Sequence, residues 1–413
     1  MTAAASSRGA LGIVFITVFI DLLGFGIVLP LLPRYAEHFH ARGLTLGLLM
    51  ASFSAMQFLF APLWGRVSDR IGRRPILMLG LAGSTLSYAL FGYATSLGPD
   101  GRLLGLEALT WLFITRIGAG IAGATIPTAQ AYIADCTGPQ ERAKGMALIG
   151  AAFGIGFTFG PLLGAAFVSA ELGQPPSAAP GYVAAVLSGI AFLVAACVLP
   201  ESLRTDSRAA PHHWLDLSSL RTALARPAIG RILWAMFITT FAFAQFESTL
   251  SLLTDRLKLS PRYNFYVFAY VGLVLTLSQG LLVRRLVPKV GEFAMGLAGT
   301  LLMAVGLLAV GLAAWQGSLP LLYGVLPISV IGFSALNPSL QSLLSRHTLA
   351  TQQGGVLGLG QSMSAMARIL GPVAGMKLFE ESPTSPYWMA AAVMALSLFL
   401  IVGLRGNPEA DVP

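Results

Sequence analysis

Long apolar stretches separated by short polar ones occupy the chain from one end to the other. A helix that crosses a lipid bilayer needs about 20 mainly apolar residues. The pattern therefore predicts twelve membrane-spanning helices. Their approximate ranges are 11–33, 44–65, 76–97, 108–134, 145–170, 181–199, 229–253, 263–283, 293–315, 318–345, 355–379 and 385–404.

One long polar connection divides these spans into two sets of six. Such a division is typical of transporters built from two structurally repeated halves. We expect an all-α polytopic membrane protein, with residues 1–200 and 229–413 as two pseudo-symmetric six-helix halves. Residues 201–228 are the predicted cytoplasmic linker. Within it, Trp214–Leu224 is predicted to form a short amphipathic helix on the membrane surface.

Composition and charge agree with a membrane protein. Hydrophobic residues make up 55% of the chain and charged residues 11%, whereas soluble domains carry about 25% charged residues. The net charge is +8, but the basic residues lie in short loops, so nucleic-acid binding is not expected. With both termini in the cytoplasm, 17 of the 26 Lys and Arg residues fall on the cytoplasmic side. This bias predicts that orientation in the cell (inner) membrane.

The sequence indicates no cofactor, metal site or catalytic centre. The two cysteines, Cys136 and Cys197, are far apart, and all five histidines lie in predicted loops, so neither a disulfide framework nor a metal site is expected. No phosphate-binding loop is present, which argues against direct ATP coupling. The first apolar run is too long for a signal peptide and contains Asp21, so we expect it to be retained as a helix.

The loop between the second and third spans has a distinctive sequence. It reads Gly65-Arg-Val-Ser-Asp69-Arg70-Ile-Gly72-Arg73-Arg74-Pro75, and a weaker copy runs from Gly280 to Glu292. It resembles the signature loop of the major facilitator superfamily. The resemblance implies the fold of that superfamily, with a central cavity, and a loop that locks the halves in the outward-facing state.

By the same resemblance, Arg73 pairs with Asp135 at the end of span four, and Asp69 faces a helix N-terminus of the other half. Ion pairs and helix-end dipoles made in only one conformation would account for such a lock. The alternative is that these arginines only fix the topology.

Two charged residues lie near the middle of predicted spans. Asp21 follows Phe19-Ile in the first span, and Arg116 begins the run Arg116-Ile-Gly-Ala-Gly120 in the fourth. Charges at this depth are costly and usually functional. The segments resemble the first helix and the fourth-helix arginine motif of drug:proton antiporters. We hypothesise that Asp21 carries the proton and that Arg116 tunes its proton affinity. The alternative is a static ion pair between spans one and four.

Span five contains a stripe of small residues. Gly156, Gly160 and Gly164 recur at intervals of four, and Pro161 removes a backbone donor. This run resembles the antiporter motif of the same superfamily, and a similar sequence occurs at Gly371-Pro372 in span eleven. Generic close packing of helices is the alternative.

The second half has its own charged residues inside spans, Glu247 and Arg368. Glu247 is a candidate second proton site or substrate contact, or the two form a structural pair. Other polar and aromatic side chains are candidates for the wall of the cavity, although hydrogen bonds between helices explain the polar ones equally well. These candidates are Phe25, Gln57, Gln130, Phe243, Gln245, Asn337, Gln341 and Gln361.

Further matches extend the resemblance over most of the chain. They are Tyr132-Ile-Ala-Asp135, Pro200-Glu201-Ser202 and Gln353-Gly354. The pattern is most similar to tetracycline-resistance pumps and other drug:proton antiporters, as in multidrug efflux and antibiotic resistance. Those pumps carry a buried acid in the third helix and a histidine in the eighth, and this chain has neither.

The resemblance implies a monomeric secondary transporter that exports a lipophilic or amphiphilic small molecule in exchange for protons, by alternating access. One alternative is a facilitator or proton symporter of a nutrient or metabolite. Another is a membrane receptor that transports nothing.

Overall fold

The computed structural model describes residues 2–136, 142–169, 175–203, 226–347 and 353–406. In the first half of the chain the elements are α1 (Thr2–Val28), α2 (Leu32–His38), α3 (Gly43–Ile71), α4 (Arg73–Ser96), β1 (Arg102–Leu103), β2 (Leu106–Glu107), α5 (Ala108–Gly123), α6 (Ile126–Cys136), α7 (Arg142–Ala165) and α8 (Ala179–Val198). In the second half they are α10 (Pro227–Arg256), α11 (Pro261–Leu277), the π-helix η1 (Ser278–Val283), α12 (Arg284–Val290), α13 (Glu292–Gln316), α14 (Leu319–Arg346), α15 (Gln353–Glu381), α16 (Ser385–Val402) and the 3₁₀-helix η3 (Gly403–Gly406).

Each of the twelve predicted spans coincides with one helix or with consecutive helical pieces. Among the described residues, nine helices are long and apolar enough to cross a membrane, and the bent pair Gly12–Val28 and Leu32–His38 gives a tenth. The other two predicted spans correspond to α7 and α15, which both begin next to residues outside the described ranges. The all-helical membrane fold expected from the sequence is confirmed. The predicted surface helix Trp214–Leu224 lies outside the described residues.

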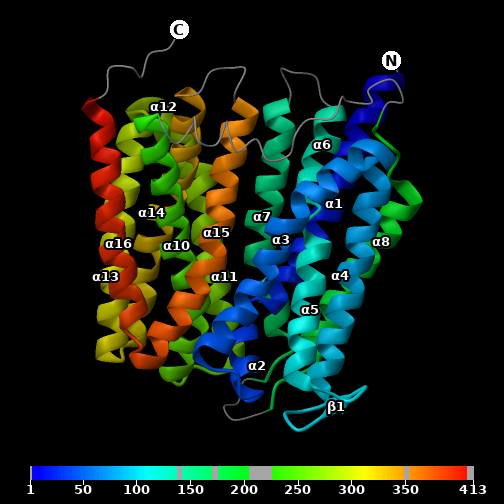
Figure 1. The fold of residues 1–413 in the computed structure, drawn as a ribbon, viewed down its shortest axis with the longest axis horizontal. Coiled ribbons are helices and arrows are strands. Elements are labelled where there is room, and N and C mark those ends of the chain that lie inside the picture. Colours follow the sequence, from blue (N-terminus) through cyan, green and yellow to red (C-terminus); the bar gives the residue numbers. More distant parts are fainter. Residues whose placement is uncertain (1, 137–141, 170–174, 204–225, 348–352, 407–413) are drawn as a thin grey trace. The chain divides into compact units, whose positions relative to one another are not determined.

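The chain folds into two compact units (Figure 1). The first comprises Met1–Ala41, Ser52–His212 and Lys258–Leu273, and the second comprises Arg42–Ala51, His213–Leu257 and Val274–Pro413. Each unit is thus one half of the sequence with a short segment exchanged: the start of α3 joins the second unit and most of α11 joins the first. The linker expected over 201–228 stays a prediction, because most of it is not described.

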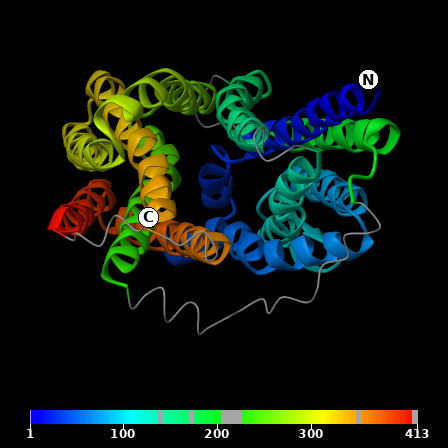
Figure 2. The same cartoon turned by 90° about the horizontal axis from the view of Figure 1, so that it is seen from above.

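Both units use the same order of helix packing. In the first unit α1 packs against α7 and α8, and α4 packs against α5 and α8. In the second unit α10 packs against α15 and α16, and α13 packs against α14 and α16. Figure 2 shows the helices of each unit end-on. The matched order is that of two structural repeats, as the six-plus-six division of the spans predicts.

Two local departures from the sequence prediction have physical causes. The fourth span is divided into α5 and α6, because Pro127 lacks the N–H that would bond to the carbonyl of Gly123. The amide Nε2 of Gln57 in α3 donates to that carbonyl instead, at 3.2 Å. Before α5, β1 and β2 form a small antiparallel hairpin. Its turn residues Leu104 and Gly105 have φ values of 51° and 78°, as in a two-residue hairpin turn.

Candidate functional site

Asp21 is a half-buried carboxylate on α1 that is surrounded by hydroxyl groups. Ser188 of α8 donates a hydrogen bond from its Oγ to Oδ1 of Asp21 at 3.1 Å. Ser84 of α4 is the second hydroxyl beside the carboxylate. A serine hydroxyl can donate to a carboxylate and can also accept from a protonated acid. These surroundings can therefore hold Asp21 with or without a proton.

Arg116 is a buried cation on α5, with 3% of its surface exposed. Its guanidinium carbon lies 4.5 Å from the ring centroid of Phe53 in α3, and its Nε has no hydrogen-bond partner among the described residues. Tyr88 of α4 is close enough to interact electrostatically with both Asp21 and Arg116. The ion pairs found among the described residues include none between Asp21 and Arg116. The static ion pair considered from the sequence is thus not formed in this conformation.

The glycine stripe of α7 brings this helix against the backbone of α1. A Cβ atom at Gly160 would lie 2.9 Å from the Cα of Gly26, and one at Gly156 would lie 3.0 Å from the Cβ of Leu22. The ring of Pro161 packs at the same place, 3.5 Å from a Cβ built at Gly26. Gly164 instead faces the ring of Phe265 in α11. The stripe therefore packs α7 onto the helix that carries Asp21.

Glu247 and Arg368 are neighbours in the second unit. Glu247 lies half-buried on α10, and Arg368 lies exposed on α15. The two side chains interact electrostatically, but the ion pairs of the described residues do not include them. Glu247 therefore stays a predicted proton site or substrate contact.

The two aromatic candidates for the cavity wall belong to aromatic stacks. Phe25 of α1 stacks on Phe53 with 5.0 Å between ring centroids and meets Phe157 of α7 edge-on at 5.9 Å. Phe243 of α10 stacks on Phe333 of α14 at 3.8 Å.

The polar candidates differ in their surroundings. Gln57 bonds to the carbonyl of Gly123, and Gln341 donates to Asn337 at 3.4 Å within α14, as expected for bonds within and between helices. Gln130 and Gln361 are exposed.

Gln245 is fully buried in this conformation, and its place in the cavity wall stays a prediction. Its exposed fraction is 0%, and neither polar atom of its amide has a hydrogen-bond partner in the part of the chain that the structure describes. A Cβ atom at Gly375 of α15 would lie 3.3 Å from both the Cα and the Cγ of Gln245. In this conformation the side chain is therefore packed between α10 and α15, because Gly375 allows the two helices to approach.

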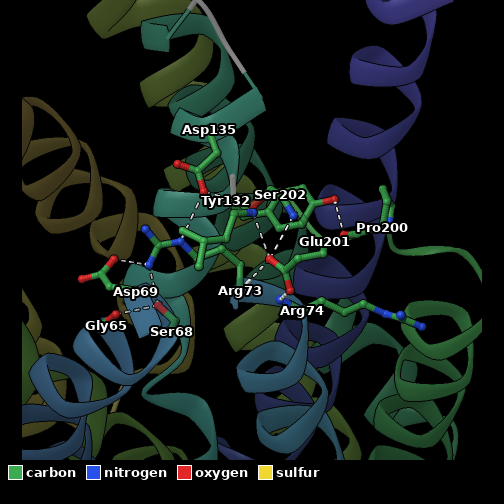
Figure 3. Close-up of polar contacts among 11 residues, drawn as sticks. Gly65, Ser68, Asp69, Arg73, Arg74, Tyr132, Asp135, Pro200, Glu201 and Ser202 are labelled. Carbon is green, nitrogen blue, oxygen red and sulfur yellow. Dashed lines mark hydrogen bonds and ion pairs between the residues drawn. The ribbon is translucent and has the colours of Figure 1, made fainter. Parts of the chain in front are cut away.

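The signature loop forms a network of polar contacts around Arg73 (Figure 3). The guanidinium Nε of Arg73 lies 3.3 Å from Oδ2 of Asp135 at the end of α6. Its Nη1 lies 2.5 Å from Oδ1 of Asp69 and donates to Oγ of Ser68 at 2.6 Å. The pairing of Arg73 with Asp135 is thus found. Asp69 contacts Arg73, and its proposed contact with the other half stays a prediction.

Glu201, in the segment after α8, caps the N-terminus of α4. Its carboxylate accepts the backbone N–H of Arg73 at 2.8 Å and that of Arg74 at 3.1 Å, and it also accepts the N–H groups of Ser202 and Leu203. A carboxylate at this position satisfies free N–H groups and faces the positive end of the helix dipole.

Ser202 and Tyr132 join this cap to α6 (Figure 3). Ser202 donates from its Oγ to Oδ2 of Asp135 at 3.0 Å, and the hydroxyl of Tyr132 donates to the carbonyl of Pro200 at 2.9 Å. The segment Pro200-Glu201-Ser202 therefore connects the ends of α4, α6 and α8.

The other arginines and the glycines of the loop have different surroundings. Arg74 donates from Nη2 to the carbonyl of Ala196 in α8 at 2.6 Å. Arg70 is exposed. Gly65 accepts a hydrogen bond from Ser68 at 2.6 Å, and Gly72 has a φ of 112° that favours glycine.

Sequence reasoning missed several residues around the charged side chains. The motif that contains Glu201 was recognised, but its capping role requires the fold to bring residues 73 and 201 together. Tyr88, Ser84 and Ser188 are single polar residues in apolar helices, and a serine or tyrosine there is too common to identify a site.

Comparisons with known proteins agree with this architecture. The sequence pattern of the Major Facilitator Superfamily matches residues 14–372. The chain belongs to the major facilitator superfamily. It is therefore a multi-pass secondary transporter and not an enzyme, as the signature loop predicts.

Individual members of the superfamily match nearly the whole chain. Tetracycline resistance protein, class C, from Escherichia coli is 31% identical over 404 residues, which cover 96% of this chain and 96% of that protein. Multidrug resistance protein 2 from Bacillus subtilis is 29% identical over 388 residues, covering 93% and 92%. The crystal structure of the human organic anion transporter MFSD10 (TETRAN) has a TM-score of 0.70 and 28% sequence identity, covering 96% of this chain and 99% of that one.

Proposed function

We propose that this transporter exports a lipophilic or amphiphilic organic molecule in exchange for protons, by alternating access in the cell (inner) membrane. It acts as a monomer with both termini in the cytoplasm. The observation that carries the proposal is Asp21, a carboxylate within a membrane span that has hydroxyl neighbours and forms no ion pair among the described residues. Gly26 of the same helix packs against Gly160 of α7, in the run that resembles the antiporter motif.

This arrangement supports coupling between protonation and helix movement. An ionised carboxylate inside the membrane is costly unless it reaches a partner or water. Protonation removes that cost, so it shifts the balance between conformations that differ in the access of water to Asp21. Because the backbones of α1 and α7 are in close contact at Gly26 and Gly160, a displacement of α1 either moves α7 with it or breaks this contact.

The network around Arg73 supports a gating role for the signature loop. It joins the ends of α4, α6 and α8 through contacts that can be made or broken as a set. Two discrete arrangements of such a set are what alternating access requires.

The relatives support an organic small molecule as substrate. Their names refer to tetracycline resistance, multidrug resistance and organic anion transport. These names refer to drugs or to organic anions, and none refers to a macromolecule.

Proton flux into liposomes tests the proposal. The purified protein is reconstituted with a pH dye inside the vesicles, a proton gradient is imposed, and lipophilic drugs are added one at a time. We expect drug-dependent proton flux in the wild type and background flux in Asp21→Asn. Glu107→Gln, which changes an exposed acid in β2, is the matched control and should behave as the wild type.

The other outcomes separate the alternatives. Equilibration of labelled drug without proton flux would replace antiport by facilitated diffusion. Drug-dependent proton flux that survives in Asp21→Asn but is lost in Glu247→Gln would move the proton site to the second unit. No movement of drug or protons in the wild type would favour a receptor.

A further inference from the structure

Arg116 is a cation inside a membrane span that forms no ion pair with any of the described residues. Its Nε has no hydrogen-bond partner in the same part of the chain. A buried arginine is normally stabilised by an anion that accepts several of its N–H groups. Its observed neighbour is the face of Phe53, at 4.5 Å.

Asp21 does not supply the missing anion in this conformation. Its Oδ1 already accepts a hydrogen bond from Ser188, and Tyr88 lies within electrostatic reach of both charged groups. The two charges belong to the same polar region but do not neutralise each other by direct contact.

A continuous row of aromatic rings begins at Arg116. The guanidinium lies over Phe53, Phe53 stacks on Phe25 at an interplanar angle of 29°, and Phe25 meets Phe157 edge-on. These rings come from α3, α1 and α7. Phe25 is half-buried, so part of its ring is exposed and can contact a ligand.

We infer that Arg116 and the rings of Phe53, Phe25 and Phe157 form a subsite for an aromatic anion, a carboxylate or a sulfonate on a planar ring. This inference rests on the proposed export of amphiphilic molecules, and it names the charge of the substrate. A carboxylate accepts two N–H groups of a guanidinium at once, and it therefore replaces the weaker cation–π contact with Phe53. The hydrophobic ring of the ligand stacks on the aromatic row.

Three matched naphthalene probes test the charge preference. The full-length protein is placed in nanodiscs of uncharged (zwitterionic) lipid, and the binding of 2-naphthoate, 2-naphthamide and 2-naphthylmethylammonium is measured by calorimetry. In the wild type we expect 2-naphthoate to bind most tightly and the ammonium compound most weakly. Tighter binding of the ammonium compound, or no detectable binding of 2-naphthoate, overturns the inference.

Substitutions then assign the preference to Arg116. We expect Arg116→Gln to weaken binding of 2-naphthoate by about 30-fold, since it removes one partner of a buried charged pair, and to leave binding of 2-naphthamide unchanged. Arg116→Lys keeps the charge but lacks the planar guanidinium, so its affinity for 2-naphthoate should lie between those of the wild type and Arg116→Gln. Unchanged binding of 2-naphthoate in Arg116→Gln contradicts the inference. If that variant does not fold, the lysine variant and the ranking of probes in the wild type still decide.

Asp21→Asn separates this inference from the proposed function. It should lose proton coupling in liposomes and keep binding of 2-naphthoate. If the wild type moves no protons but 2-naphthoate binding depends on Arg116, the subsite stands and antiport fails. If the wild type exports drugs against protons but Arg116→Gln binds 2-naphthoate normally, antiport stands and the subsite fails.

Discussion

The starts of α4 and α13 carry ion pairs at matching positions, with the charges exchanged. Arg73, the first residue of α4, pairs with Asp135 at the end of α6. Glu292, the first residue of α13, pairs with Arg346, the last residue of α14, at 2.9 Å. The two units thus have an ion pair at the same place, but the positive and the negative residue are exchanged between the two helices.

The surroundings of the two pairs differ much more than their positions. The side chain of Arg73 is 9% exposed and that of Arg346 is 66% exposed. Arg73 also contacts Asp69 and Ser68, whereas Glu292 accepts one further bond, from Ser342 at 3.2 Å. A buried arginine needs its partners. A pair contributes less when its arginine is largely hydrated, although the side chain of Glu292 is only 13% exposed. We therefore expect the first pair to control stability and the second to be nearly dispensable.

The largest effect is expected for Arg73→Gln. The substitution removes the contacts with Asp69, Asp135 and Ser68 together and should lower the free energy of unfolding by about 3 kcal/mol. Thermal unfolding followed by tryptophan fluorescence measures the loss. Arg70→Gln, which changes an exposed arginine of the same loop, is the control and should melt as the wild type does. Equal melting of the two variants would contradict the role assigned to Arg73.

The glycines before the two helices offer a second, matched comparison. Gly72 has a φ of 112° and Gly291 a φ of 82°, so alanine is strained at both, by about 1–3 kcal/mol. A Cβ atom at Gly72 would also collide with the carboxylate of Glu201, whereas one at Gly291 would meet nothing within 4 Å. Gly72→Ala should therefore destabilise the protein more than Gly291→Ala. Equal shifts in melting temperature would mean that Glu201 moves aside without cost.

A smaller effect is expected for Glu201→Gln. The amide oxygen of glutamine can still accept backbone N–H groups, but the negative charge at the N-terminus of α4 is lost. Loss of this charge-assisted cap should cost about 1–2 kcal/mol. Thermal unfolding again measures it, with Glu107→Gln as the control for removal of an exposed acid. A variant as stable as the wild type would show that the charge of Glu201 adds nothing to the cap.

These contacts show how far sequence reasoning reaches. The spans follow from the length of apolar runs, because a bilayer imposes a minimum length on every crossing helix. The pair of Arg73 and Asp135 followed from resemblance to a known motif. The pair of Glu292 and Arg346 was missed, since the weaker copy of the signature loop that ends at Glu292 indicates no partner for it. The two residues come together only when α13 packs on α14.

For the charged residues inside the spans, the sequence identified the residues but not their partners. Their depth identified Asp21 and Arg116, because charges are rare in such helices. Their partners could not be predicted, since Ser188, Tyr88 and Phe53 are ordinary residues of membrane helices. The packed position of Gln245 depends on Gly375 of a helix more than a hundred residues away.

The smallest effect is expected for Glu292→Gln. Arg346 stays largely hydrated without its partner, so the loss should be about 0.5 kcal/mol. Added salt screens the exposed charge of Arg346, and the difference between wild type and variant should disappear at about 1 M NaCl, where the Debye length is about 3 Å. Asp135→Asn, the matched change in the first unit, should keep most of its effect at high salt because Arg73 is buried. A salt-resistant loss above about 2 kcal/mol in Glu292→Gln would show that the second pair is as important as the first. The exchange of charges would then preserve one structural role in both units.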